Sequence, residues 1–369
     1  MRKDISWRSQ MMSRLTLLAI VLCSVGLGAQ SAEPPKGNPE GPSSEKSVYD
    51  DLRTGRELTS EQVESLEEKL VSNPNDVTSR TQLLGYYGGS RALLDDSAKA
   101  AKRRHVLWLI RNAADSEVLG HPEAGIDRIL DREGYSQAKK AWMDQLEGEP
   151  ENATRLGNAA RFFLIADRRT SIKLLRRAQS LDPSNPKWPK KLGHAFGLAA
   201  DRGSGAIDQE LSEKELEQLE KAYELSGESG RDSLLVDLAK AAFAADRLDK
   251  ARHYAELMLQ NTEAGWNYGN RVHHGNLVLG RIALREGNIE EAKSRLIAAG
   301  KSPGSPQLNS FGPNMLLAKA LLEIGEREIV IEYFELCSKF WEMHRGRLDE
   351  WGTLAVAGKI PDFRGNLRY

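Results

Sequence analysis

Cysteine is nearly absent from this chain of 369 residues, which contains only Cys23 and Cys337. Cys23 lies inside an apolar run near the N-terminus, so Cys337 alone remains for the folded part of the protein. Without a second cysteine no internal disulfide forms, and helix packing has to hold the fold together. Related segments carry Ala299 and Met258 at the equivalent position. This favours a small buried apolar role for Cys337 over a reactive thiol.

Strand patterns are missing as well. Val, Ile and Thr nowhere alternate with polar residues over a useful length between turn residues, so we predict an all-α chain.

Enzyme motifs are also scarce. The chain has no Walker A loop and no G-x-G-x-x-G, and Gly203-Ser204-Gly205 lacks the preceding strand of a nucleophile elbow. We therefore predict no catalytic residues and no cofactor, with an enzyme of an unrecognised kind as the alternative.

Histidine spacing gives no support for a metal site. None of the seven histidines is followed by another at i+4, and the adjacent pair His273-His274 would point about 100° apart on a helix.

Charge is also nearly balanced, with 52 Lys and Arg against 53 Asp and Glu, for a formal net charge of −1. This balance does not require a nucleic-acid partner, and RNA-binding helical repeats would need a base-reading pattern in every repeat. We predict neither metal nor nucleic acid.

One long apolar run does occur, at the N-terminus. Arg2, Lys3, Arg8 and Arg14 precede Leu15 to Ala29, and small residues follow up to Ala32. Basic residues, an apolar stretch and small residues in this order are typical of a secretory signal peptide, predicted over residues 1–32. The run is shorter than a membrane-spanning helix requires, so an uncleaved membrane anchor is the less favoured alternative. The predicted location is the periplasm or the outside of the cell, without a transmembrane helix after cleavage.

Residues 33–47 contain Pro, Gly, Ser and charged side chains but no large apolar group. This composition predicts a disordered linker. Two helices should follow, over 48–58 and 60–71, and act as an N-terminal cap.

A helical hairpin is predicted between His273 and Pro306. Leu279, Gly280 and Ala283 mark its first helix, and Gly287 breaks that helix. On the second helix, apolar residues recur at i, i+4 and i+7. Two further segments repeat all seven positions in register. The three sets are Leu279, Gly280, Ala283, Gly287, Ala292, Leu296, Ala299; Leu317, Ala318, Leu321, Gly325, Val330, Phe334, Cys337; and Leu238, Ala239, Ala242, Asp246, Ala251, Ala255, Met258.

This spacing resembles the tetratricopeptide repeat (TPR), a helical hairpin of about 34 residues with small residues where its helices cross. The resemblance implies a right-handed α-solenoid with capping helices at both ends. The predicted domains are degenerate repeats with the N-terminal cap over 48–152, clear repeats over 153–342, and a C-terminal capping helix with its tail over 343–369.

One column of side chains stands out in the first helices of the predicted repeats. The residue after each small residue is a potential cation, namely Arg161, His194, Lys240, Arg281 and Lys319. The resemblance implies that first helices line the concave surface, so these five would form a basic ladder in a groove. Such a ladder suits an acidic partner segment. Exposed helix positions often carry Lys or Arg in any case, and coincidence is the competing explanation. Phe243, Leu284 and Leu322 would either lie beside the ladder or be buried between repeats.

Two insertions, 201–211 and 261–270, lengthen the repeat at loop positions. Trp266 and Tyr268 of the second insertion would make an exposed aromatic contact, or fold back onto a helix.

The chain is thus predicted to be an exported scaffold that docks another protein, with envelope assembly as its process. The alternative is a carrier of small ligands or glycans, with Trp266, Tyr268 and Trp188 around a pocket. Nothing in the sequence indicates the partner's identity or the oligomeric state.

Overall fold

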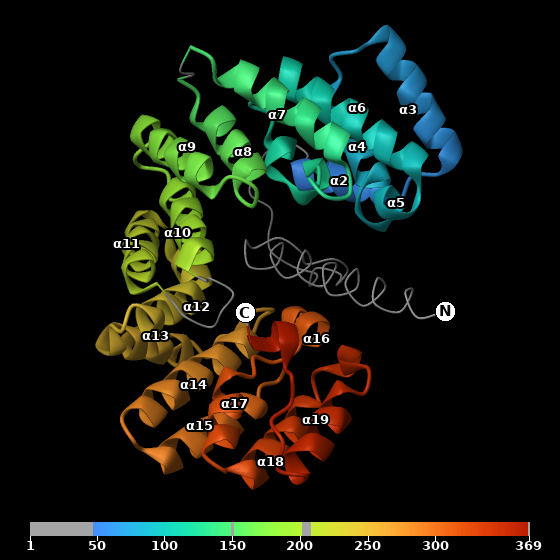
Figure 1. The fold of residues 1–369 in the computed structure, drawn as a ribbon. Helices are drawn as coiled ribbons and strands as arrows, with labels where there is room; N and C mark the ends of the chain where they lie inside the picture. The colour runs from blue at the N-terminus through green and yellow to red at the C-terminus, as the bar shows by residue number, and fades with distance from the viewer. Residues whose placement is uncertain (1–46, 149–150, 201–207, 368–369) are drawn as a thin grey trace, which may run out of the picture. The chain divides into compact units, whose positions relative to one another are not determined.

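The computed structural model describes residues 47–148, 151–200 and 208–367. Across these ranges every regular element is a helix, and there is no strand (Figure 1). The prediction of an all-α chain is confirmed. The predicted signal peptide and nearly all of the predicted linker lie outside the described residues, as does most of the insertion 201–211. In the described part of the chain, no helix has both the length and the apolar character that crossing a membrane demands.

The described chain divides into two compact units, and the boundary falls inside helix α10 (Lys187–Ala200), between Ala195 and Phe196. Besides the start of α10, the N-terminal unit contains α2 (Val48–Arg56), α3 (Ser60–Ser72), α4 (Val77–Tyr87), α5 (Gly89–Leu94), α6 (Asp96–Asn112), the 3-10 turns η1 (Glu117–Gly120) and η2 (Pro122–Ala124), α7 (Arg132–Leu146), α8 (Ala153–Phe163) and α9 (Arg168–Leu181).

Side-chain caps fix where these helices begin. Ser47 and Thr59 form capping boxes with Asp50 and Gln62, and Asp76 accepts the backbone N–H of Ser79. The two predicted N-terminal helices are present as α2 and α3, and α2 packs mainly against α4. Two glycines explain this choice. A Cβ on Gly55 would lie 1.9 Å from Gln82 O, and one on Gly85 would lie 2.2 Å from Leu52 O, so the two backbones are nearly in contact.

The C-terminal unit contains the end of α10 together with α11 (Gln209–Leu225), α12 (Glu228–Ala244), α13 (Leu248–Gln260), α14 (Tyr268–Arg285), α15 (Ile289–Gly300), α16 (Pro306–Phe311), α17 (Leu316–Glu323), α18 (Arg327–Cys337), η3 (Glu342–His344), α19 (Arg347–Val356) and η4 (Arg364–Leu367). Consecutive helices pack as hairpins, α12 with α13, α14 with α15, and α17 with α18. Neighbouring hairpins also touch, since α13 packs on α14 and α15 on α18.

The turn inside each hairpin repeats in detail. Asp246, Gly287 and Gly325 have φ angles of 58°, 78° and 92°, in the left-handed region. The residue after each of them donates its N–H to the carbonyl five positions back, at 2.8, 2.8 and 3.0 Å, in the pairs Arg247 to Ala242, Asn288 to Ala283 and Glu326 to Leu321. This is the hydrogen bond of a Schellman C-cap. Three hairpins in the register read from the sequence therefore end their first helices in the same way.

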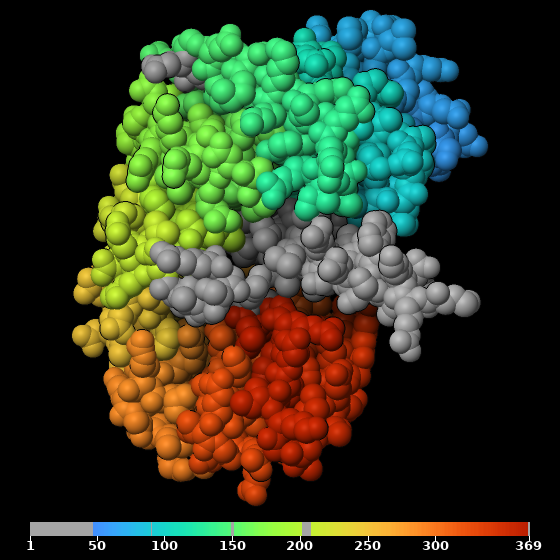
Figure 2. All heavy atoms as spheres, in the orientation of Figure 1, coloured from blue at the N-terminus to red at the C-terminus, as the bar shows by residue number. Residues whose placement is uncertain are grey.

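The other repeated positions form the core of the unit. All six apolar or small positions are buried in each of the three copies. At Gly280 an added Cβ would lie 3.4 Å from Ala292 O, in the second helix of the same hairpin, and 2.4 Å from Leu317 Cδ2, in the next hairpin. The absence of a side chain at Gly280 therefore lets both neighbours pack closely. On the face seen in Figure 2, the segments coloured orange to red pack without a hollow.

The last residues of the chain pack onto this core. Phe363 is fully buried, and its ring lies 5.0 Å from that of Trp351 in α19. Asn366 accepts the backbone N–H of Met315 and donates to the carbonyl of Pro313, at 2.8 Å each. Ile360 of the same tail is 46% exposed and does not join this core. The tail thus fastens the loop that precedes α17.

Candidate functional site

The first helices of successive hairpins bring two of the predicted features together. Arg281 of α14 places its guanidinium carbon 4.0 Å from the centre of the Phe243 ring of α12, and Arg285 lies 5.5 Å from the same ring. The two arginines of one hairpin therefore make cation–π contacts with an aromatic ring of the neighbouring hairpin. Phe243 and Leu284 are only partly buried, whereas Leu322 is 7% exposed and belongs to the core.

Lys240 and Arg281 lie near each other on this surface, and neither forms an ion pair within the described chain. Burial lowers the pKa of Lys240 to about 8, and repulsion from Arg281 adds to this, although Asp237 opposes it. Burial also lowers the pKa of Arg281 to about 10, helped by repulsion from Arg285. Cations that form no ion pair keep their attraction for an anion that arrives from outside.

The remaining three predicted cations differ from Lys240 and Arg281 in their ion pairing or in the unit to which they belong. Lys319 of α17 is partly exposed and lies 3.6 Å from Glu323, one turn along its own helix. Arg161 of α8 and His194 of α10 lie in the N-terminal unit. Burial lowers the pKa of Arg161 to about 10, with Glu123 nearby to oppose the shift. The structure therefore gathers three of the five predicted cations in one unit, and the strongest juxtaposition is Lys240 with Arg281.

The second insertion is held in place by an ion pair between two residues that were not predicted to belong to the site. Arg271, which is 5% exposed, donates to Asp232 of α12 at 3.1 Å. The same carboxylate accepts amide N–H groups of Asn261 and Asn267, at 3.0 and 3.1 Å. The sequence offers no distinct signal for this pair, because Arg271 lies among other polar residues in the first half of α14. The insertion is thus a fixed structure attached to α12.

The two aromatic residues of this insertion have different environments. Trp266 is 57% exposed. Tyr268 begins α14 and is half-buried, with Arg271 5.8 Å from its ring centre. Trp188 is only 1% exposed, and its Nε1–H donates to Asp182 in the N-terminal unit. A sugar-binding pocket built from all three rings is therefore not favoured, since Trp188 has no open face.

His273 and His274 have a structural role that their spacing did not reveal. The backbone N–H of Asn314 donates to His273 Nε2 at 3.2 Å, so Nε2 carries no proton. The proton is then on Nδ1, which donates to Ala299 O at 3.2 Å. Burial lowers the pKa of His273 to about 4 and holds that of His274 well below its usual value. Both rings are neutral side chains of the core, and in the described residues no group of three or more His, Cys, Asp or Glu is arranged to bind a metal.

One serine has the spacing of a nucleophile elbow, in the segment Gly300-Lys301-Ser302-Pro303-Gly304. The segment follows helix α15, not a strand, and Ser302 is 7% exposed. Its hydroxyl donates to Gly269 O at 2.8 Å and accepts the N–H of Gly304 at 3.1 Å. Ser302 therefore connects the loop after α15 to the first turn of α14 and has no geometry for attack on a substrate.

Comparison with known proteins gives little guidance. No protein-family model matches the chain. The chain is 30% identical over 226 residues to a protein of Methanosarcina acetivorans described as a DNA double-strand break repair Rad50 ATPase. That similarity covers 58% of this chain but only 20% of the other protein. The match therefore leaves the family of this chain open.

Proposed function

We propose that this protein is a TPR-like α-solenoid that docks an acidic segment of a partner protein along its first helices. The observation that carries the proposal is that Lys240 and Arg281 lie close together without an ion pair to a described residue, and that Arg281 lies against Phe243. Acidic side chains of the partner would pair with these two cations, and an apolar neighbour would cover the ring. The repeated Schellman turns and the buried small residues support the architecture, because hairpins that share one packing rule stack side by side.

The cell compartment rests on the sequence alone. The basic residues and apolar run of residues 1–32 support export to the periplasm or beyond the cell. There the solenoid would act as an adaptor in envelope assembly without chemistry of its own. The buried Cys337, whose thiol pKa burial raises, fits such a compartment because the unreactive thiol would not enter mixed disulfides.

A charge-reversal experiment tests the docking surface. We expect the combined change Lys240→Glu, Arg281→Glu and Lys319→Glu to remove most of the affinity for the partner, at least about a hundredfold, because three attractive contacts become repulsive. The mature chain is used as bait in its native cells, with chemical crosslinking and mass spectrometry of the captured proteins. Affinity for each captured protein is then measured with purified components.

The matched control reverses three lysines that are exposed and form no ion pair in the described chain, namely Lys301, Lys339 and Lys359. This variant has the same net charge as the test variant and should bind the partner as the unmodified chain does. If both variants lose the partner equally, net charge explains the loss. If both keep it, the first helices do not bind the partner, and the proposed docking surface is wrong.

A further inference from the structure

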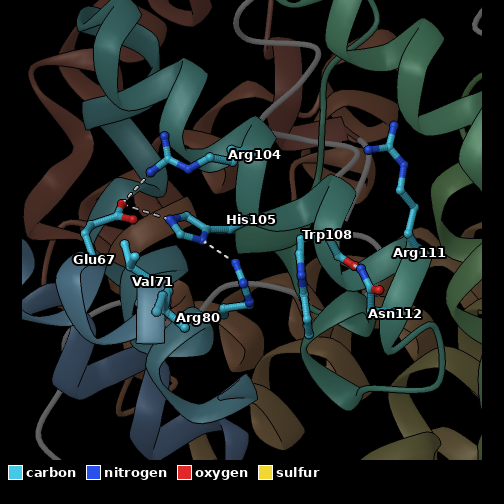
Figure 3. Close-up of a pocket in the computed structure, with 9 residues that line it drawn as sticks. Glu67, Val71, Arg80, Arg104, His105, Trp108, Arg111 and Asn112 are labelled. Atoms are coloured by element: carbon cyan, nitrogen blue, oxygen red, sulfur yellow. Dashed lines mark hydrogen bonds and ion pairs between the residues drawn. The ribbon is translucent and has the colours of Figure 1, made fainter. Parts of the chain in front are cut away.

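A small trough lies in the N-terminal unit between the end of α3 and one face of α6 (Figure 3). Its volume is about 350 Å³, at the lower end of the range for ligand sites. Leu70 and Val71 of α3 line one side, and Trp108 of α6 lines the other. Val71 is 86% exposed, so an apolar side chain at this edge is left uncovered.

The floor of the trough is a rigid hydrogen-bonded network. Arg80 of α4 stacks on Trp108, with 3.8 Å from its guanidinium carbon to the ring centre, and it donates to Pro74 O. Its Nη1 also donates to His105 Nδ1 at 3.2 Å. Since arginine only donates, Nδ1 accepts, and the proton of the neutral imidazole is on Nε2. That proton is donated to Glu67 Oε1 at 3.0 Å (Figure 3).

The charges of this network do not cancel at the surface. Buried Arg80 and the Glu67 carboxylate offset each other, and His105 is neutral because burial lowers its pKa. Arg104 donates to Glu67 at 2.7 Å, yet its side chain is 59% exposed. Arg111 is exposed and forms no ion pair with any described residue. The mouth of the trough therefore carries an excess of two positive charges.

The two exposed arginines flank the indole ring along a single helix face. Arg104, Trp108 and Arg111 are spaced at i, i+4 and i+7 on α6, so they share that face. Seven residues of helix separate the two arginines by about 10 Å along the axis. In an extended peptide alternate side chains share one face, so residues i and i+4 lie about 13 Å apart on the face that also carries residue i+2, a distance that the long arginine and glutamate side chains can span. The pattern of cation, apolar surface and cation thus matches two carboxylates at i and i+4 with an apolar side chain at i+2 between them.

We propose that this trough is a second docking site, specific for a short acidic peptide segment with an apolar side chain between its carboxylates. The apolar side chain lies against Trp108 and Val71, and the carboxylates bind Arg104 and Arg111. The fixed floor keeps Trp108 in place before the ligand arrives, which reduces the ordering that binding requires. The proposal does not depend on the docking surface of the C-terminal unit.

A labelled peptide of sequence Glu-Glu-Leu-Leu-Glu-Glu, acetylated and amidated at its ends, tests the site by fluorescence anisotropy with the full mature chain. We expect binding that weakens with salt, and a loss of about fivefold or more for Arg111→Gln, because one charge-assisted contact is removed. Arg128→Gln, which removes an exposed arginine elsewhere in the same unit, should leave the affinity unchanged.

A second variant blocks the trough without touching its floor. Val71→Asp places a carboxylate at the exposed edge and should abolish binding, whereas Val356→Asp, at a position 70% exposed in α19, should not. Circular dichroism spectra that match the unmodified chain establish that both variants fold. The charge-reversed variant at Lys240, Arg281 and Lys319 should bind the peptide normally, so this proposal and the proposed function fail independently.

Four outcomes overturn the proposal. The first is no binding of the acidic peptide. The second is equal binding of the peptide Gln-Gln-Leu-Leu-Gln-Gln, which would indicate an apolar contact alone. The third is equal affinity for the Arg111→Gln and Arg128→Gln variants. The fourth is full displacement of the peptide by inorganic phosphate at a concentration equal to that of the peptide, which would indicate a simple anion site.

Discussion

The substitution His273→Ala is expected to destabilise the C-terminal unit by about 4 kcal/mol, because it leaves a cavity and two unpaired buried groups. The imidazole is fully buried and connects α14 to the end of α15 and to the loop before α17. Without it, the carbonyl of Ala299 and the N–H of Asn314 lose their partner. Urea unfolding gives the free energy, and hydrogen exchange of the Asn314 amide reports the local effect. The exposed residue His253 is the control, and its replacement by alanine should change stability by less than about 0.5 kcal/mol.

The same histidine predicts how stability depends on pH. Its pKa in the folded chain is about 4, below the ordinary value of 6.5, so the unfolded chain binds the proton more readily. Its contribution is therefore fully present above pH 6.5 and is lost as the pH falls toward 4. The loss amounts to about 3 kcal/mol for this group, and His274 adds to it in the same direction. A flat stability profile between these two pH values would contradict the assignment of neutral imidazoles.

The second large effect is expected where α2 crosses α4. Gly85→Ala should cost about 3 kcal/mol or more in the N-terminal unit, because its Cβ would lie 2.2 Å from Leu52 O, a backbone atom that cannot rotate away. Gly55→Ala should cost a similar amount, since its Cβ would meet Gln82 O at 1.9 Å. Thermal unfolding followed by circular dichroism measures both changes.

The control for these two variants is the same substitution at a glycine with free space around it. Gly352 lies within α19, and a Cβ there would have no neighbour within 4 Å. Gly352→Ala should stabilise the chain by about 0.5 to 1 kcal/mol, because alanine restricts the unfolded chain more than glycine does. If all three variants destabilised the protein equally, helix crossing would not be the cause.

The repeat could be predicted over its clearest part because its signals are local. Apolar periodicity, a residue that tolerates positive φ and the next apolar stripe lie within one stretch of about 34 residues. Gly287 and Gly325 were visible as helix ends for this reason. Asp246 fits the same slot, since short polar side chains tolerate the left-handed conformation. Within the predicted degenerate repeats of residues 48–152, the stretch around His121 has no such signal, and there the chain forms two 3-10 turns instead of a full helix.

The candidate site was only partly predictable. The column of cations could be read from the sequence, but its environment could not. Arg281 lies against an aromatic ring of the previous repeat, whereas Lys319 meets a carboxylate on its own helix. The trough beside Trp108 gave no sequence signal, because its lining combines three helices whose residues are up to about 45 positions apart.

The sequence by itself determined the helical class, the register of the three clear hairpins and the left-handed turn that ends each first helix, because these depend on neighbours a few positions away. Tertiary structure alone decided that α2 pairs with α4, that His273 is a neutral bridge, and which cations lack a carboxylate partner. These properties depend on which distant atoms share a buried space, and burial sets both the protonation state of a group and its need for a partner.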